Sequence, residues 1–242
     1  MWDYLKQTGA ILKNKPLIYK NIKDFRNNLD EAVVYLSEND EILRKIIPGI
    51  GVCRLKPHKK YFETLVDAII SQQLSVTVAE AIFKRFKLLF RNDTNGSQRF
   101  PAPADIISAA DEKLRACGLS KAKVRYVKDL ALHVLDNKVR IMNLNNLPDN
   151  EIIEELIQVK GIGVWTAQMF LIFCLGRLNV LPVDDLGLKK AIMLNYKLRK
   201  LPDASRIGNI SKLYNWEPYN SVATWYLWQS LSVNNYLTKQ GT

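Results

Sequence analysis

The stretch that decides the fold runs from residue 156 to residue 188 and reads LIQVKGIGVWTAQMFLIFCLGRLNVLPVDDLGL. Gly161 and Gly163 interrupt two segments with the apolar spacing of helices, so we expect one helix to stop, turn tightly and restart. The restarted segment, residues 164–175, is apolar on nearly every face and shorter than the roughly 20 residues that span a bilayer. These features predict a hairpin of two helices whose second member is buried in the core.

Two adjacent carboxylates follow the hairpin at the start of another predicted helix. Asp184 and Asp185 come directly after Leu181-Pro182-Val183. Such residues commonly cap a helix, because a carboxylate oxygen accepts hydrogen bonds from the first N–H groups. A carboxylate can also stabilise positive charge that develops during a reaction. The residues alone leave both interpretations open, and repulsion between two acids in one site favours distinct roles for them.

The composition and charge narrow the class of partner. The chain has 242 residues, of which 48% are hydrophobic and 24% charged, and it carries a formal net charge of +11. The balance is typical of a globular protein rather than a disordered or membrane protein. The positive charge favours nucleic acid as the partner, although an anionic membrane surface or ribosomal neighbours would also attract a basic protein.

The cysteines and the N-terminus indicate the compartment. Cys53, Cys117 and Cys174 lie far apart with no CxxC pair, which favours a reducing compartment over disulfides or a zinc site. An iron–sulfur cluster held by four cysteines near the C-terminus is excluded. The first residues lack the apolar run of a secretory signal. We expect a cytoplasmic, nucleoid-associated protein, or a nuclear one if the source is eukaryotic.

The rest of the chain indicates an all-α fold. Alternating strand patterns never exceed a few residues, whereas helical spacing recurs. A polar loop is expected at residues 91–103. Helices are predicted at residues 25–46, 60–71, 75–90, 121–135, 151–159, 188–198, 202–213 and 221–231, with two short helices within residues 104–117.

Two polar features allow more than one interpretation. The helix that starts after Ser120 carries a row of cations, which forms either a solvated face or a surface that faces phosphates. The turn at residues 71–75, SQQLS, is by its composition a polar connection between helices. The cations of the row are Lys121, Lys123, Arg125 and Lys128.

The hairpin, the loop with Pro182 and the following acid occur in the order typical of helix-hairpin-helix DNA glycosylases, the HhH-GPD superfamily. The sequence resembles this family over roughly residues 61–231, and among its subfamilies it is most similar to DNA-3-methyladenine glycosylase II. Lys160 replaces the Pro usual in the hairpin, and Asn220 replaces a common Arg. The matching residues are Leu156, Val159, Gly161, Ile162, Gly163, Thr166, Ala167 and Asp185, and further patches are ISQQLS (70–75), LRACGLS (114–120) and WEPYNS (216–221).

The resemblance implies roles for the acid and for the two turns. Asp185 matches the catalytic aspartate, which stabilises the cationic sugar or orients water during cleavage of the N-glycosidic bond. The wedge that fills the gap left by an extruded base would be Gln73 and Leu74. The hairpin would bind a DNA phosphate through Gly161, Ile162, Gly163 and Thr166, and the carbonyls of Ile157, Val159 and Ile162 match those that can hold a Na or K ion.

The resemblance also implies the type of reaction. Trp165 stands where relatives that cleave the DNA backbone carry a Lys nucleophile, so a monofunctional hydrolase that leaves an abasic site is expected. Alkylated purines such as 3-methyladenine are cationic and are attracted to aromatic faces. The residues that match the base pocket are Trp165, Met169, Trp228 and Gln229, although Trp165 could be an ordinary core residue; Met169 and Gln229 replace Tyr of some relatives.

The expected architecture has two helical subdomains with an active-site cleft between them. An N-terminal helical segment, residues 1–56, should pack with the C-terminal helices of residues 183–242. A helical core, residues 57–182, should contain the hairpin at 156–167. The expected partner is double-stranded DNA with damaged bases, bound by a monomer with no required cofactor. A glycosylase for deaminated or oxidised bases and a non-catalytic helix-hairpin-helix DNA-binding protein are the alternatives.

Overall fold

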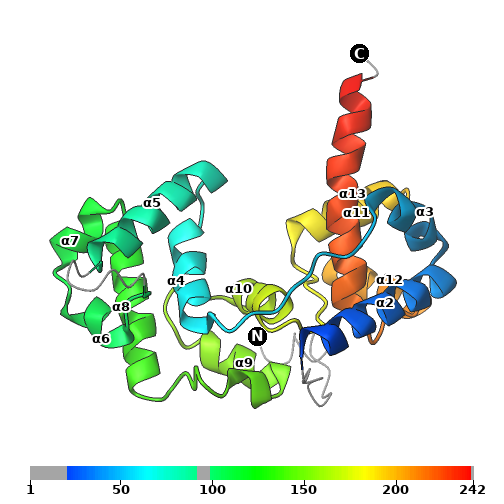
Figure 1. Ribbon diagram of the computed structural model, residues 1–242. Helices are drawn as coiled ribbons and strands as arrows, with labels where there is room; N and C mark the ends of the chain where they lie inside the picture. Colours follow the sequence, from blue (N-terminus) through cyan, green and yellow to red (C-terminus); the bar gives the residue numbers. More distant parts are fainter. Residues whose placement is uncertain (1–20, 92–98, 241–242) are drawn as a thin grey trace. The chain divides into compact units, whose positions relative to one another are not determined.

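The computed structural model describes residues 21–91 and 99–240, and every regular element in these residues is helical (Figure 1). The predicted all-α class is thereby confirmed. The longer elements are α2 (Ile22–Asn39), α3 (Glu41–Ile50), α4 (Tyr61–Ser71), α5 (Val76–Leu89), α8 (Lys121–Leu135), α9 (Asp149–Leu156), α11 (Leu186–Asn195), α12 (Ala204–Leu213) and α13 (Asn220–Gln240). The shorter ones are α6 (Pro103–Ser108), α7 (Asp111–Ala116), α10 (Val164–Met169), a 3-10 turn (Leu144–Asn146) and a π-helical turn (Phe170–Cys174).

The described residues form two compact units. Unit 1 takes its residues from 1–58, 148–150 and 171–242, and unit 2 from 59–147 and 151–170. The first expected boundary, after residue 56, is close to this division. The second differs, because the chain returns to unit 1 at Leu171 rather than after Pro182. A continuous apolar run has the same pattern whichever core it enters, so the sequence could not locate this change.

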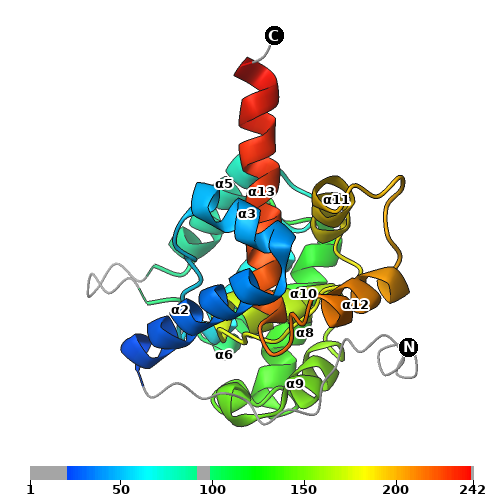
Figure 2. The same cartoon turned by 90° about the vertical axis from the view of Figure 1, so that its right-hand side faces the viewer.

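Unit 1 is built around α13. Both α3 and α11 pack along α13, and α2 packs against α3 and α13 (Figure 2). Phe25, Trp216 and Tyr226 are among its largest fully buried side chains. The short segment Pro148–Asn150 joins this unit through Asp149, whose Oδ1 lies 3.0 Å from Nε of the buried Arg177.

The helix predicted at residues 25–46 is in fact two helices that meet at Asp40. This buried carboxylate caps α3, because its Oδ1 accepts hydrogen bonds from the Ile42 and Leu43 N–H groups at 2.8 and 3.1 Å. Its Oδ2 accepts from the Trp216 indole at 2.8 Å and from the Tyr196 hydroxyl. The acid therefore ends one helix, starts the next and ties both to the C-terminal half.

Unit 2 is built around α8, against which α4, α6 and α7 pack. Its core contains Leu65, Phe86, Ile106 and Val127, all inaccessible to solvent. Ser120 caps α8 as expected, since its Oγ accepts from the Lys123 N–H at 3.2 Å. Among the helices of the described residues, none is long and apolar enough to cross a membrane.

Candidate active site and nucleic-acid interface

Asp185 is the N-terminal cap of α11 and is fixed by two hydrogen bonds. Its Oδ1 accepts from the Leu188 N–H at 2.6 Å and from the Trp228 indole N–H at 2.8 Å. The first bond is an ordinary helix cap. The second comes from α13, 43 residues further along the chain. The half-buried Asp185 carboxylate therefore caps α11 and is also positioned by the Trp228 ring.

An aromatic stack and a glycine complete the surroundings of Asp185. The Trp228 ring stacks on Phe173, with ring centroids 5.7 Å apart and planes 19° from parallel. A Cβ on Gly187 would lie 3.0 Å from the Asp185 Oδ1 and 3.2 Å from the Trp228 Nε1. The missing side chain thus lets the indole approach the acid. Sequence reasoning missed Phe173 and Gly187; a glycine inside α11, two residues after the acid, was the available signal for Gly187.

The two adjacent acids make different contacts. The Asp184 side chain is more than half exposed, and its Oδ1 lies 3.5 Å from the Lys189 ammonium. The hydrogen bonds from Leu188 and Trp228 go to Asp185. Gln229, next to Trp228 on α13, is half-buried.

The hairpin joins α9 to α10 in unit 2, and its two glycines serve different purposes. Gly161 has a φ of +87°, and a Cβ there would lie 2.7 Å from Cγ of the Tyr126 ring. Gly163 has an extended backbone, with φ −99° and ψ 175°, and a Cβ there would meet nothing within 4 Å. Only Gly161 is therefore required by the turn itself. Gly163 leaves open space at the N-terminus of α10.

The other residues of the expected hairpin site are buried or half-buried. Ile162 and Thr166 are buried. The Val159 carbonyl accepts a hydrogen bond from the Ile162 N–H at 3.0 Å, which closes the turn. Ile157, the third residue of the expected cation site, follows α9 directly and is half-buried.

The segment after the hairpin differs from the predicted buried helix. Instead of one helix over residues 164–175, a short α10 passes into a π-helical turn, an irregularity often found at functional sites. Trp165 is 48% exposed and Phe173 is 41% exposed, although most neighbours are buried. Trp165 and the half-buried Met169 are one turn apart, so they share a face of α10 in unit 2.

The turn predicted as the wedge lies beside the hairpin. Gln73 has a φ of +56°, which is unusual for a residue other than glycine, and Leu74 is 37% exposed. The Gln72 amide donates a hydrogen bond to the Gly161 carbonyl at 2.6 Å. Sequence reasoning named the two exposed residues and missed the contact made by Gln72, because the partners are 89 positions apart.

The row of cations on α8 is not uniformly exposed. The Lys123 ammonium turns inward and donates to the carbonyls of Ile70 and Gln72 at 2.6 and 2.8 Å. Lys128 pairs with Asp111. Of the four predicted cations, Lys121 and Arg125 are exposed and form what remains of the basic face. The Lys123 ammonium is therefore not part of a solvated face, and the phosphate contact of this row stays a prediction.

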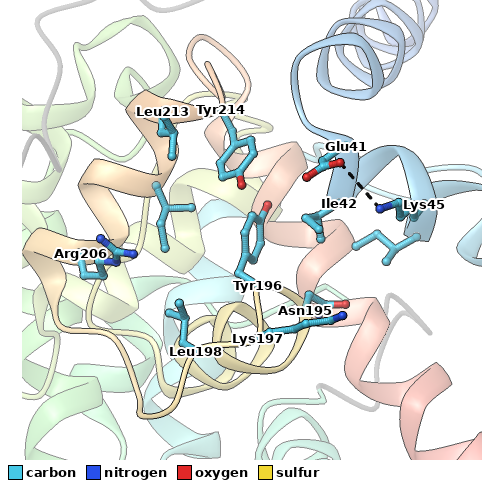
Figure 3. Close-up of a pocket in the computed structure, with 12 residues that line it drawn as sticks. Glu41, Ile42, Lys45, Asn195, Tyr196, Lys197, Leu198, Arg206, Leu213 and Tyr214 are labelled. Atoms are coloured by element: carbon cyan, nitrogen blue, oxygen red, sulfur yellow. Dashed lines mark ion pairs between the residues drawn. The ribbon is translucent and has the colours of Figure 1, made fainter.

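Unit 1 also contains a pocket of about 550 Å³ (Figure 3). It lies at the C-terminal end of α11, where Asn195, Tyr196 and Leu198 line it. Asp185 caps the other end of α11, about 15 Å away for a helix of ten residues. The pocket contains none of the predicted site residues, so it is not the expected base pocket.

Metal-binding side chains do not cluster in the described part of the chain. Within residues 21–91 and 99–240, no group of three or more His, Cys, Asp or Glu side chains could hold a metal ion. The three cysteines are buried thiols and form no disulfide with one another.

Comparison with known proteins identifies the family. Residues 66–214 match the family described as the HhH-GPD superfamily base excision DNA repair protein. The chain belongs to this superfamily. The match begins in α4, includes the hairpin and the cap of α11 with Asp185, and ends just after α12. The HhH-GPD match therefore covers both the glycine turn of unit 2 and the acid of unit 1.

Relatives in this superfamily are similar over most of their length. DNA-3-methyladenine glycosylase 1 of Schizosaccharomyces pombe is 33% identical over 213 residues, which cover 86% of this chain and 90% of the relative. The S. pombe 3-methyladenine DNA glycosylase in complex with abasic DNA has a TM-score of 0.69, over 82% of this chain and 95% of that chain. A DNA-3-methyladenine glycosidase from Bacillus halodurans, 34% identical, has a TM-score of 0.71 over 82% of this chain and 88% of its own.

Proposed function

We propose that this protein is a monofunctional DNA glycosylase of base excision repair. It hydrolyses the N-glycosidic bond of flipped-out alkylated purines of the 3-methyladenine type and leaves an abasic site. The observation that carries the proposal is the Asp185 carboxylate, held at the start of α11 by the Leu188 N–H and the Trp228 indole. Relatives with 33% and 34% identity are named as glycosylases of this base class.

The chemistry follows from charge. As the bond between base and sugar breaks, positive charge develops on the sugar, and a fixed carboxylate stabilises that charge without needing to reorient. The hydrogen bonds from α11 and α13 hold the Asp185 carboxylate in one orientation. A water molecule then supplies the incoming oxygen, so the reaction is a hydrolysis that consumes no redox cofactor.

We assign the selectivity for alkylated purines to aromatic rings. A purine alkylated at a ring nitrogen is cationic, so it is attracted to aromatic faces and leaves readily. Trp228, which donates to Asp185, and its stacking partner Phe173 are the aromatic rings of unit 1 assigned to this attraction. The other residues proposed for the base pocket are Trp165, Met169 and Gln229. Because Trp165 replaces the Lys of backbone-cleaving relatives, the proposed enzyme stops at the abasic site.

The proposed partner is duplex DNA, bound by a monomer. The N-terminus of α10 presents backbone N–H groups beside the open space at Gly163, which suits a phosphate. Gln73 and Leu74 are the proposed wedge. Neutral carbonyl oxygens suit a monovalent cation, so Ile157, Val159 and Ile162 would hold a Na or K ion. The proposed compartment is the cytoplasm with its nucleoid, or the nucleus in a eukaryote.

Base release from defined duplexes tests the proposal. Duplexes with 3-methyladenine, 7-methylguanine, hypoxanthine, uracil or 8-oxoguanine would be incubated with excess wild-type enzyme and with Asp185→Asn. We expect the wild type to release the alkylated purines and to leave abasic strands that are not cut. We expect Asp185→Asn to release no alkylated purine. Release of only the neutral 8-oxoguanine would contradict the proposed base class. Equal release by Asp185→Asn would contradict the assigned acid.

A further inference from the structure

One face of α8 contacts both of the turns that the proposed function assigns to DNA. Lys123, Tyr126 and Asp129 are spaced three residues apart, so their side chains lie along one side of the helix. Lys123 contacts the wedge turn, while Tyr126 and Asp129 contact the hairpin. All of these contacts lie within unit 2.

Lys123 fixes the end of α4 and Gln72 of the wedge turn, residues 71–75. Its ammonium donates to the Ile70 carbonyl at 2.6 Å and to the Gln72 carbonyl at 2.8 Å. The last carbonyls of a helix lack partners within the helix, and a cation there also interacts favourably with the helix dipole. Burial lowers the pKa of Lys123, as expected for an ammonium that has exchanged water for two carbonyls.

Gln72 connects the wedge turn to the hairpin. Its carbonyl is held by Lys123, and its side-chain amide donates to the Gly161 carbonyl at 2.6 Å. The next residue, Gln73, has the strained φ of +56° and is exposed. Such a backbone conformation persists only where the surroundings hold it, and the bonds made by Gln72 and Lys123 provide that restraint.

The hairpin is held by the next two residues along the same face. The Tyr126 ring packs against Gly161 so closely that a Cβ there would lie 2.7 Å from its Cγ. The Asp129 Oδ2 accepts from the Lys160 N–H at 2.8 Å, and its Oδ1 lies 3.6 Å from the Lys160 ammonium. The glycine turn is therefore held by Tyr126 and Asp129 of α8 and by the side-chain amide of Gln72.

We propose that Lys123 and Gln72 are positioning residues that make the wedge turn and the hairpin one rigid body. The hairpin would grip a phosphate while the wedge occupies the space of the extruded base, and both must be in place together. A displacement of about 1 Å between such parts is costly in an enzyme. This inference rests on the proposed function, and neither residue is assigned a contact with the base or the sugar.

Two variants and a charge-matched control test the proposal. Lys123→Met removes the ammonium and keeps the stem, and Gln72→Ala removes only the bond to the hairpin. Lys113→Met removes one positive charge from an exposed position on α7. We expect the two positioning variants to release 3-methyladenine from duplex DNA about tenfold more slowly at saturating enzyme, the loss typical for a hydrogen bond of this kind. Release from single strands, which need no wedge, should change less than threefold or so.

A structural readout separates this proposal from the proposed function. Amide hydrogen exchange of the free protein should become faster at residues 71–75 and 160–163 in Lys123→Met, and stay as in the wild type in Lys113→Met. That measurement needs no catalysis, so it remains decisive if the wild type releases no alkylated base. Unchanged exchange in Lys123→Met would overturn the proposal, and so would equal losses on duplex and single-stranded substrates. Thermal unfolding shows whether a variant loses activity only because it misfolds. Gln72→Ala is a second, milder test, because it leaves the bonds from Lys123 to the backbone carbonyls intact.

Discussion

At the scale of single residues, Asp185 has a structural function as a helix cap and, in the proposed reaction, a chemical one. Its Oδ1 caps α11 and also accepts from the Trp228 indole. An asparagine retains an oxygen that can accept both bonds but lacks the negative charge. The two functions can therefore be separated by one substitution.

We expect Asp185→Asn to fold normally and to lose most activity. Loss of a fixed charge that stabilises the reacting centre typically lowers the rate by about 10² to 10³. Single-turnover base release, with thermal unfolding as the fold check, measures the effect. The neighbouring Asp184→Asn is the matched control, since Asp184 pairs with Lys189 at the surface, and its rate should stay close to that of the wild type. A comparable loss in both variants would show that the negative potential of this segment matters, rather than one acid.

Gly187→Ala should trade activity for helix stability. Gly187 is the second residue of α11, where alanine gains over glycine less than the roughly 1 kcal/mol of a helix interior. The added Cβ would lie 3.0 Å from the Asp185 Oδ1 and 3.2 Å from the Trp228 Nε1, so this pair must separate. We expect an unfolding midpoint equal to or above that of the wild type and a rate of base release about tenfold lower, from the weakened hydrogen bond. An unchanged rate would mean that the contact between Trp228 and Asp185 does not position the acid.

At the scale of elements, the hairpin shows how two glycines in one motif can have different causes. Gly161 has a left-handed backbone and a ring packed against it. Gly163 has an extended backbone with open space around it. The fold therefore explains the first glycine, whereas we propose that the second leaves room for a DNA phosphate at the N-terminus of α10.

Alanine substitutions distinguish these causes. Gly161→Ala should destabilise the protein by about 2 kcal/mol or more, because it combines left-handed strain with a clash against Tyr126. Gly163→Ala should cost less than about 1 kcal/mol yet weaken binding to undamaged duplex about tenfold, since its Cβ obstructs a phosphate that accepts charge-assisted hydrogen bonds. Urea unfolding and fluorescence anisotropy provide the two measurements. If Gly163→Ala bound DNA as tightly as the wild type, the hairpin would not be the phosphate site.

The helices around α13 make unit 1 sensitive to alkaline pH. Burial raises the pKa of Tyr226 to about 12 from its ordinary 10.0, and burial raises the pKa of Cys53 to about 11 from 9.0. The folded state thus retains protons that the unfolded chain releases. The resulting stability is fully present below about pH 9 and is lost as the pH rises through 11 and 12.

Urea unfolding at pH 7, 9 and 11, followed by circular dichroism, should therefore give similar free energies at the first two values and a lower one at the third. Tyr226→Phe loses the hydrogen bond from the hydroxyl to the Gly51 carbonyl, so it should be less stable at neutral pH. It should also depend less steeply on pH above 10, because the titrating group is gone. A slope equal to that of the wild type would assign the alkaline loss to other groups.

At the scale of the whole molecule, we expect charge to govern the affinity for DNA and the proposed acid, Asp185, to govern the rate of base release. The formal net charge of +11 attracts DNA without regard to sequence. We expect affinity for undamaged duplex to fall more than about tenfold between roughly 50 and 200 mM salt. The single-turnover rate at saturating enzyme should change far less, since the Asp185 hydrogen bonds are internal. Titrations and rates at matched salt concentrations test this, and an equally steep fall in the saturated rate would contradict it.

The sequence by itself determined the all-α class, the glycine turn and the order in which hairpin, loop and acid follow one another. These features depend on spacing within a few residues, where apolar periodicity and glycine directly reflect local backbone geometry. Ser120 as a helix cap is of the same kind.

Only the tertiary structure decided which groups meet. The indole of Trp228 reaches Asp185 across 43 positions, and the amide of Gln72 reaches Gly161 across 89. The Asp40 carboxylate, which caps α3 locally, also accepts bonds from Tyr196 and Trp216, and the Lys123 ammonium turns inward to the carbonyls of Ile70 and Gln72. Periodicity records that a side chain is buried, but its partner is fixed by long-range packing, which a local pattern does not encode.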